Sequence, residues 1–156
     1  MADAVDGCVF CAIANGQLPA SITHQDADFL AIPDIGQIRR GHTLIFPREH
    51  VETFEQMAPQ PAARLMHLGQ RIAKVQKQLY GADRVGFLLT GGDVPHVHAH
   101  LVPMVEKTDL TSRRYIQEQT LAFRALPAAS PDLLAETAAE LRKALQDNPP
   151  STGDLP

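Results

Sequence analysis

The spacing of apolar residues along the chain predicts one long helix in the middle and a second helix near the end. In residues 57–80, apolar positions recur in steps of three and four, the period of an α-helix with one buried face. Gly81 follows and is expected to end this helix. A second amphipathic segment runs from Leu133 to Gln146, with Ser130 before Pro131 as the candidate N-cap. The apolar face of the first helix contains Leu65, Leu68, Ile72, Val75 and Leu79.

Short apolar stretches between turn-forming residues predict strands. Short connections favour antiparallel pairing, and the helices are expected on one side of the sheet. We therefore assign an α+β fold with an antiparallel sheet of about five strands, one long central helix and a C-terminal helix. Cys8–Asn15 also predicts a short helix that stops at Gly16. The expected strands are Ile22–His24, Asp28–Ile32, Gly41–Phe46, Val85–Thr90 and His96–Val105.

The composition is that of one soluble domain and excludes several classes of function. The 156 residues are 44% hydrophobic and 21% charged, with no Trp and a formal net charge of −4. So few aromatic residues and so little positive charge argue against a nucleic acid partner. The apolar runs are too short to span a membrane, and residues 1–10 do not resemble a secretory signal. A cytoplasmic protein is expected.

Cys8 and Cys11 are the two cysteines, and their C-x-x-C spacing has three interpretations. A disulfide is disfavoured in a reducing compartment. A thioredoxin-like motif requires a preceding strand, which residues 1–7 do not predict. Half of a zinc site is the third interpretation, and it requires two further ligands from elsewhere in the chain.

Three of the seven histidines, His96, His98 and His100, alternate with apolar residues. If this segment is a strand, the three imidazoles share one face and the residues between them face the core. A solvated polar face and a three-histidine metal site are the alternatives. Side chains on one flat strand converge poorly on a tetrahedral ion, so we favour catalysis. His24 and His67 have no predicted role beyond the surface.

Several segments together resemble the histidine triad (HIT) family, in its bacterial, zinc-containing Hint-like branch. His96–Pro103 resembles the triad signature, and Gly41–His50 resembles the family's G-H-x-L-φ-φ-P-x-x-H segment. Cys8–Cys11 resembles an N-terminal C-x-F-C, and Asp34-Ile35 a ribose-binding pair. The implied organisation is a disordered lead-in at 1–7, a HIT domain at 8–115, a C-terminal helical extension at 116–147 and a disordered tail at 148–156.

The resemblance implies a hydrolase or transferase that cuts nucleotides at the α-phosphate. Its substrates would be nucleoside phosphoramidates, adenylates or dinucleoside polyphosphates. In the family the middle histidine is the nucleophile, here His98, and the carbonyl of His96 orients its ring. His100 would supply positive charge or a proton to the phosphate or leaving group, and His42 would complete the phosphate pocket.

The resemblance also implies a structural Zn²⁺ and a nucleotide pocket. Cys8, Cys11, His50 and His96 would complete a closed Cys₂His₂ site; reduced thiols without metal are the alternative. Asp34 would accept hydrogen bonds from the ribose, although it could instead only cap a turn. A homodimer formed through the long helix and a strand is expected. The apolar nucleotide contacts would be Phe10, Ile13, Ile32, Ile35 and Leu44, all of which could instead be plain core.

One stretch departs from the family pattern. Thr90 stands where the family has an asparagine, and the connection from there to His96 is shorter than usual. Thr90 can still contact the nucleotide through its hydroxyl, whereas Asp93 would add a repulsive charge near the phosphate. The alternative is therefore a nucleotide-binding regulatory protein with weak or no catalysis. A zinc-dependent hydrolase that uses the triad as its metal site is the third hypothesis.

Overall fold

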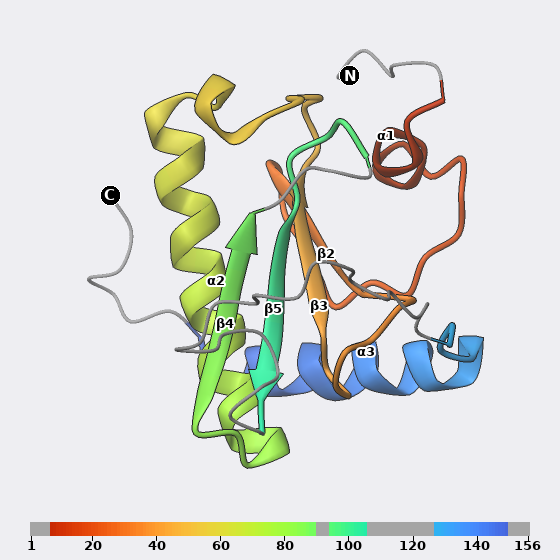
Figure 1. The fold of residues 1–156 in the computed structure, drawn as a ribbon, viewed down its shortest axis with the longest axis vertical. Helices are drawn as coiled ribbons and strands as arrows, with labels where there is room; N and C mark the ends of the chain where they lie inside the picture. Colours follow the sequence, from red (N-terminus) through yellow and green to blue (C-terminus); the bar gives the residue numbers. More distant parts are fainter. Residues whose placement is uncertain (1–6, 90–93, 106–126, 150–156) are drawn as a thin grey trace, which may run out of the picture.

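The computed structural model describes residues 7–89, 94–105 and 127–149, with one five-stranded antiparallel sheet at its centre (Figure 1). The α+β class and the antiparallel pairing predicted from the sequence are confirmed. The spatial order of the strands is β1-β2-β3-β5-β4, so the last strand in sequence is inserted between β3 and β4. The strands are β1 (His24–Gln25), β2 (Phe29–Pro33), β3 (Thr43–Pro47), β4 (Arg84–Leu89) and β5 (Ala99–Met104).

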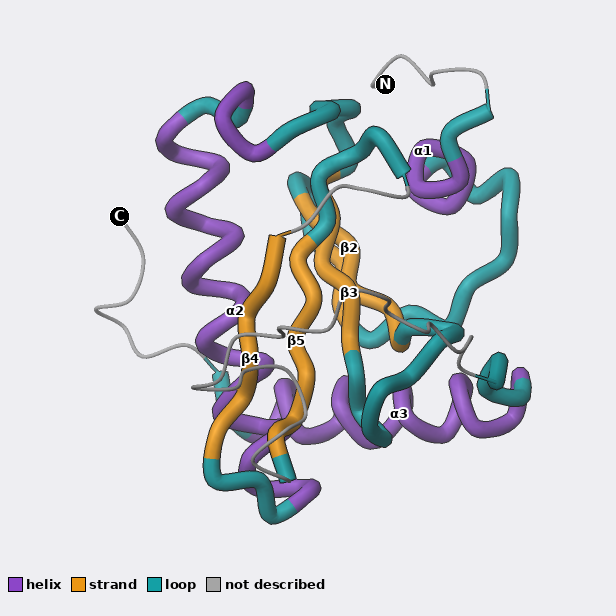
Figure 2. Tube along the Cα trace, in the orientation of Figure 1, coloured by secondary structure: helices purple, strands orange, loops and turns teal. Residues whose placement is uncertain are grey.

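The helices form where the apolar spacing predicts them (Figure 2). Gly81 ends α2 in the left-handed conformation, with φ of 61°, and the Ser130 side chain accepts from the Leu133 N–H to cap α3. A short 3-10 helix, Phe54–Gln56, precedes α2. The α-helices are α1 (Val9–Ala14), α2 (Pro59–Tyr80) and α3 (Pro131–Asp147).

The two faces of the sheet contact different layers. On one face, Ala31, Ile45 and Leu101 pack against the buried sides of α2 and α3. On the opposite face, Leu30, Ile32, Leu44 and Phe46 pack against Phe10, Cys8 and Cys11 of the N-terminal segment around α1. Alternation along each strand produces this division, because successive side chains point to opposite sides. His100 lies beside Leu44 in the β3–β5 register and therefore on the α1 face.

Some details differ from the sequence-based expectations, and the first strand is His24–Gln25 rather than Ile22–His24. The last strand begins at Ala99 rather than His96, since residues 94–96 form a bend. Leu79, predicted on the buried face of the long helix, is 42% exposed, and the neighbouring Tyr80 packs against the core at this turn of the helix. Thr90, predicted to end β4, lies outside the described residues.

The expected segment boundaries remain predictions. Residues 1–6, 106–126 and 150–156 lie outside the described part of the chain. Within it, Leu141 and Leu145 of α3 belong to the same buried cluster as Ile72 of α2 and Ala31 of β2. The C-terminal helix therefore shares its apolar core with the sheet.

Candidate active site and metal centre

His98 is held by a backbone contact that leaves one ring nitrogen for chemistry. Its side chain is 6% exposed, and Nδ1 lies 2.7 Å from the carbonyl oxygen of His96. A carbonyl only accepts, so Nδ1 carries the proton and Nε2 presents its lone pair. This is the orientation that the sequence resemblance implied for a nucleophile.

The prediction that all three histidines belong to one strand is wrong for the first two, although their predicted facing is observed. His96 and His98 precede β5, and only His100 is a residue of that strand. The ring of His96 lies against the two cysteines, whereas the His98 ring lies 5.0 Å from the His100 ring, centroid to centroid. The alternation continues through the bend before β5, because Val97, Ala99 and Leu101 lie in the core that contacts α2 and α3, whereas the rings of His96 and His98 lie beside Phe10 on the α1 face.

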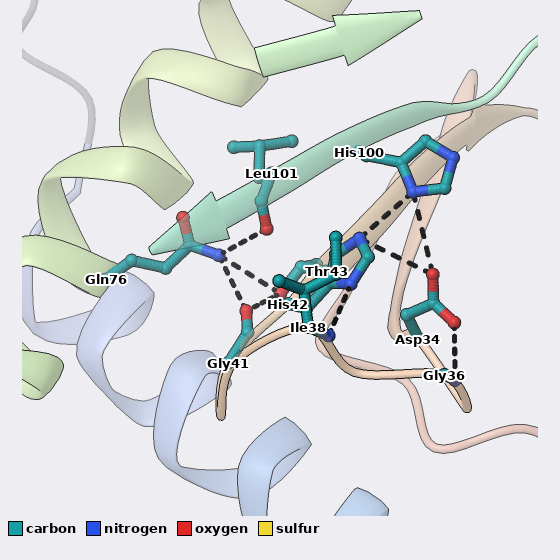
Figure 3. A network of polar contacts seen from close by, with 9 residues as sticks. All are labelled: Asp34, Gly36, Ile38, Gly41, His42, Thr43, Gln76, His100 and Leu101. Carbon is teal, nitrogen blue, oxygen red and sulfur yellow. Dashed lines mark hydrogen bonds and ion pairs between the residues drawn. The ribbon is translucent and has the colours of Figure 1, made fainter. Parts of the chain in front are cut away.

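His42 and His100 lie side by side with the carboxylate of Asp34 (Figure 3). Nε2 of His42 is 3.0 Å from Nδ1 of His100, and Asp34 Oδ2 is 3.4 Å from the first nitrogen and 3.6 Å from the second. The Asp34 N–H donates to the His42 carbonyl at 2.9 Å, which continues the β2–β3 pairing and sets the two residues opposite each other. The sequence resemblance assigned Asp34 to a ribose and did not predict this cluster.

The tautomer of His42 decides what this cluster can do. The Ile38 N–H lies 3.3 Å from His42 Nδ1, which must accept, so the ring proton is on Nε2. Burial lowers the pKa of His42 to about 4, so the ring is neutral at pH 7. Nε2–H then donates toward His100 Nδ1. Although Asp34, His42 and His100 are close enough to hold a metal ion, a protonated Nε2 offers no lone pair to one.

A glutamine of α2 contacts the backbone next to His42 and His100 (Figure 3). Gln76 is fully buried, and its amide nitrogen lies 2.7 Å from the carbonyl of Gly41 and 3.2 Å from that of Leu101. These carbonyls belong to the neighbours of His42 and His100. Gln76 was not predicted from the sequence; its signal was a polar residue beside the predicted apolar face of the long helix.

The second cluster joins the N-terminal segment to two distant histidines. Cys8 Sγ lies 3.3 Å from His96 Nδ1, and Cys11 Sγ lies 3.3 Å from His50 Nδ1 and 3.6 Å from His96 Nδ1. All four ligand atoms are within 4.8 Å of one another. Tetrahedral zinc with these ligands requires sulfur–nitrogen separations of about 3.5 Å. The residues therefore fit a zinc ion.

His96 also has the protonation that a metal ligand needs. Its Nε2 lies 2.9 Å from the Pro47 carbonyl and must donate, which leaves the lone pair on Nδ1, the atom facing the sulfurs. Burial lowers the pKa of His96 to about 4; the Pro47 carbonyl opposes this shift, and His50 and His98 contribute to it. The ring is accordingly neutral at pH 7.

Comparison with known proteins identifies the family. The sequence profile of the HIT domain matches residues 15–107, which is more than half of the chain. The chain belongs to the HIT family.

The HIT relatives include uncharacterized proteins and named enzymes. An uncharacterized HIT-like protein of Mycobacterium tuberculosis is 38% identical over 101 residues, which cover 62% of this chain and 70% of the relative. An adenosine 5'-monophosphoramidase of Schizosaccharomyces pombe is 29% identical over 101 residues, covering 62% and 73%. A zinc-bound histidine triad family protein of Mycobacterium smegmatis superposes with a TM-score of 0.69 at 34% identity, covering 91% of this chain and 95% of that one.

Most of the apolar residues assigned to a HIT nucleotide pocket lie together on the α1 face. Phe10, Ile32 and Leu44 are buried in one cluster, and Ile13 packs against its edge. The ring centroids of Phe10 and His98 are 4.9 Å apart, so this cluster adjoins the triad. Ile35 does not join them and is 66% exposed.

Among the described residues, no helix is both long and apolar enough to cross a membrane.

Proposed function

We propose that this HIT protein hydrolyses or transfers nucleotides by cleavage at the α-phosphate, through a nucleotidyl-His98 intermediate. The observation that carries the proposal is the contact between His98 Nδ1 and the His96 carbonyl, which directs the lone pair of Nε2 outward. His100 stands beside it with its Nε2 proton available for a phosphate oxygen, while the Nε2–H of His42 donates to His100 Nδ1 and completes this side of the pocket. A nucleophile beside such a donor suits displacement at phosphorus.

The proposed reaction has two displacements. In the first, His98 Nε2 attacks the α-phosphorus, the bond from phosphorus to the leaving group breaks, and the leaving group takes a proton from His100. In the second, water attacks the nucleotidyl-His98, its proton passes to His100, and the phosphorus–nitrogen bond breaks. The products are a nucleoside monophosphate and free His98; another acceptor in place of water gives transfer.

The proposed substrates are nucleoside phosphoramidates, with adenylates and dinucleoside polyphosphates as further members of the class. The name of the S. pombe relative supports the first. In the proposed pocket, Asp34 and Thr90 contact the nucleotide by hydrogen bonds. Phe10, Ile13, Ile32, Ile35 and Leu44 provide the apolar contacts, with Ile35 covering the nucleotide from its exposed position.

We further propose that Cys8, Cys11, His50 and His96 hold a structural Zn²⁺. The sulfur–nitrogen distances and the proton on His96 Nε2 support it, as does the zinc in the M. smegmatis relative. The ion would supply no reaction chemistry, since four protein ligands leave no open position. It would fix α1 and the His96 backbone, and through that backbone the ring of His98.

The proposed enzyme is cytoplasmic and homodimeric, with neither nucleic acid nor membrane as a partner. Strand β4 lies at the edge of the described sheet and exposes Leu88, and α2 exposes Met66. Large apolar side chains beside an open strand edge favour pairing with a second copy. Light scattering of the wild type and of Leu88→Lys tests the dimer.

Turnover of an adenosine phosphoramidate tests the proposed activity. Wild-type protein should release adenosine monophosphate, and His98→Ala should lose the activity. His67→Ala is the matched control, because His67 is exposed on α2 and should be replaceable without effect. Nucleotide binding without turnover by the wild type would instead support a regulatory HIT protein, the alternative raised by the short 90–95 connection.

A further inference from the structure

Asp34 is fixed in place with one carboxylate oxygen directed at the two histidines. Oδ1 accepts from the Gly36 N–H at 2.7 Å, which leaves Oδ2 facing His42 Nε2 and His100 Nδ1 (Figure 3). The side chain is 15% exposed, so it has little freedom to turn toward solvent. Both oxygens thus have defined partners within the protein.

The number of ring protons on His42 and His100 explains why a carboxylate is needed beside them. With neutral rings, His42 Nε2–H donates to His100 Nδ1, and His100 carries its proton on Nε2. When His100 takes a second proton, on Nδ1, two N–H donors face each other across 3.0 Å. Asp34 Oδ2 is then the acceptor within reach of both nitrogens.

The charges around His100 lead to the same conclusion. In the described part of the chain, the titratable groups facing its ring are Asp34, His42 and His98. Of these three, only Asp34 can carry negative charge. Burial acts to raise the pKa of Asp34, but the hydrogen bonds with His100 and the Gly36 N–H, together with the charges of His42 and His100, lower it overall. Asp34 is therefore ionised at neutral pH.

We propose that Asp34 is a positioning residue that accepts Nδ1–H of His100 on Oδ2, and so allows His100 to hold the proton that its Nε2 gives to the leaving group. This role rests on the proposed function. It is additional to the proposed contact of Asp34 with the ribose, because it requires no hydroxyl on the sugar. Asp34 itself exchanges no proton with the substrate.

The two roles of Asp34 are separated by comparing substrates with and without ribose hydroxyls. Asp34→Asn and wild type are assayed on an adenosine phosphoramidate and on its 2',3'-dideoxy analogue. The positioning role predicts that Asp34→Asn lowers kcat about tenfold to a hundredfold on both substrates. It also predicts that the alkaline limb of the pH–rate profile moves to lower pH. A loss of kcat that disappears on the dideoxy analogue, with an unchanged pH profile, would overturn the proposal and leave ribose binding.

A measurement without substrate separates this inference from the proposed function. Nitrogen-15 shifts of the imidazole rings report which nitrogen carries the proton. In Asp34→Asn, His100 should gain its second proton only at lower pH than in the wild type. Asp28→Asn, an exposed carboxylate of the same hairpin paired with Arg64, should leave the His100 signals unchanged.

A failure of the proposed function and a failure of the positioning role give different experimental results. If wild-type protein shows no turnover but Asp34→Asn alters the His100 titration, the proposed function fails and the contact stands. If turnover depends on His98 but the His100 signals of Asp34→Asn match the wild type, the positioning role is wrong. Asp34→Glu, which keeps the charge, should recover part of the His100 titration if Asp34→Asn proves unstable.

Discussion

The backbone carbonyl of His96 accepts the Nδ1–H of His98 at 2.7 Å, while the ring of His96 lies 3.3 Å from Cys8 Sγ. One residue thus connects the proposed nucleophile with the proposed zinc site. Because the peptide and the ring of His96 move together, loss of the metal should disturb the orientation of His98. The proposed zinc site would in this way hold the proposed nucleophile in position.

Removal of a zinc ligand should therefore affect both sites. His50→Ala should lose zinc, melt at a lower temperature and turn over about a hundredfold more slowly, because His98 loses its orientation. His98→Ala should retain zinc. Elemental analysis of the purified variants measures the metal content. Loss of zinc from His98→Ala, with retention in His50→Ala, would show that the triad itself binds the metal.

Gln76→Leu should weaken the fold and the active site together. Leucine has a similar volume but leaves the carbonyls of Gly41 and Leu101 without the amide, at a cost of about 1–3 kcal/mol in the free energy of unfolding. We expect a lower urea midpoint and a lower kcat, because His42 and His100 are neighbours of those carbonyls. Gln70→Leu, an exposed position on the same helix, is the control and should change neither quantity.

Gly41→Ala should destabilise the protein more than Gly16→Ala. Both glycines have positive φ, 92° and 73°, so both substitutions carry backbone strain of about 1–3 kcal/mol. At Gly41 the new methyl group would also overlap the Tyr80 ring, whereas at Gly16 it meets nothing within 4 Å. The difference between the two changes in unfolding free energy isolates the overlap. Equal changes in unfolding free energy for the two variants would contradict this prediction and show that the turn before His42 shifts to make room for the methyl group.

The metal-free protein should lose stability as the pH falls from 6.5 toward 4. In the folded state burial lowers the pKa of His42 to about 4 from 6.5, so within this window the unfolded chain binds a proton that the folded chain does not. The stability contributed by neutral His42 is fully present above pH 6.5. About 3 kcal/mol of it is lost as the pH falls to 4. Urea unfolding of His42→Gln should lack this part of the pH dependence, and His67→Gln should keep it.

The sequence predicted the regular elements and named the residues of both proposed sites, but not how these residues contact one another. The period of α2 and the C-x-x-C spacing are local signals and were sufficient for the helix and for half of the proposed metal site. The contact of Asp34 with His42 and His100 depends on the β2–β3 register and on the insertion of β5, which no local pattern encodes. The bend before Ala99 was missed because an alternating pattern was read as continuous strand. Gln76 was missed because its partners are backbone carbonyls.

The covalent intermediate tests the central claim most directly. Protein mixed with an adenosine phosphoramidate is quenched within one turnover and digested, and the peptides are analysed by mass spectrometry under conditions that preserve phosphorus–nitrogen bonds. The account predicts an adenylyl group on Nε2 of His98 in the wild type and in His67→Ala, and none in His98→Ala. Turnover by the wild type without an adduct, or an adduct that persists in His98→Ala, would contradict it.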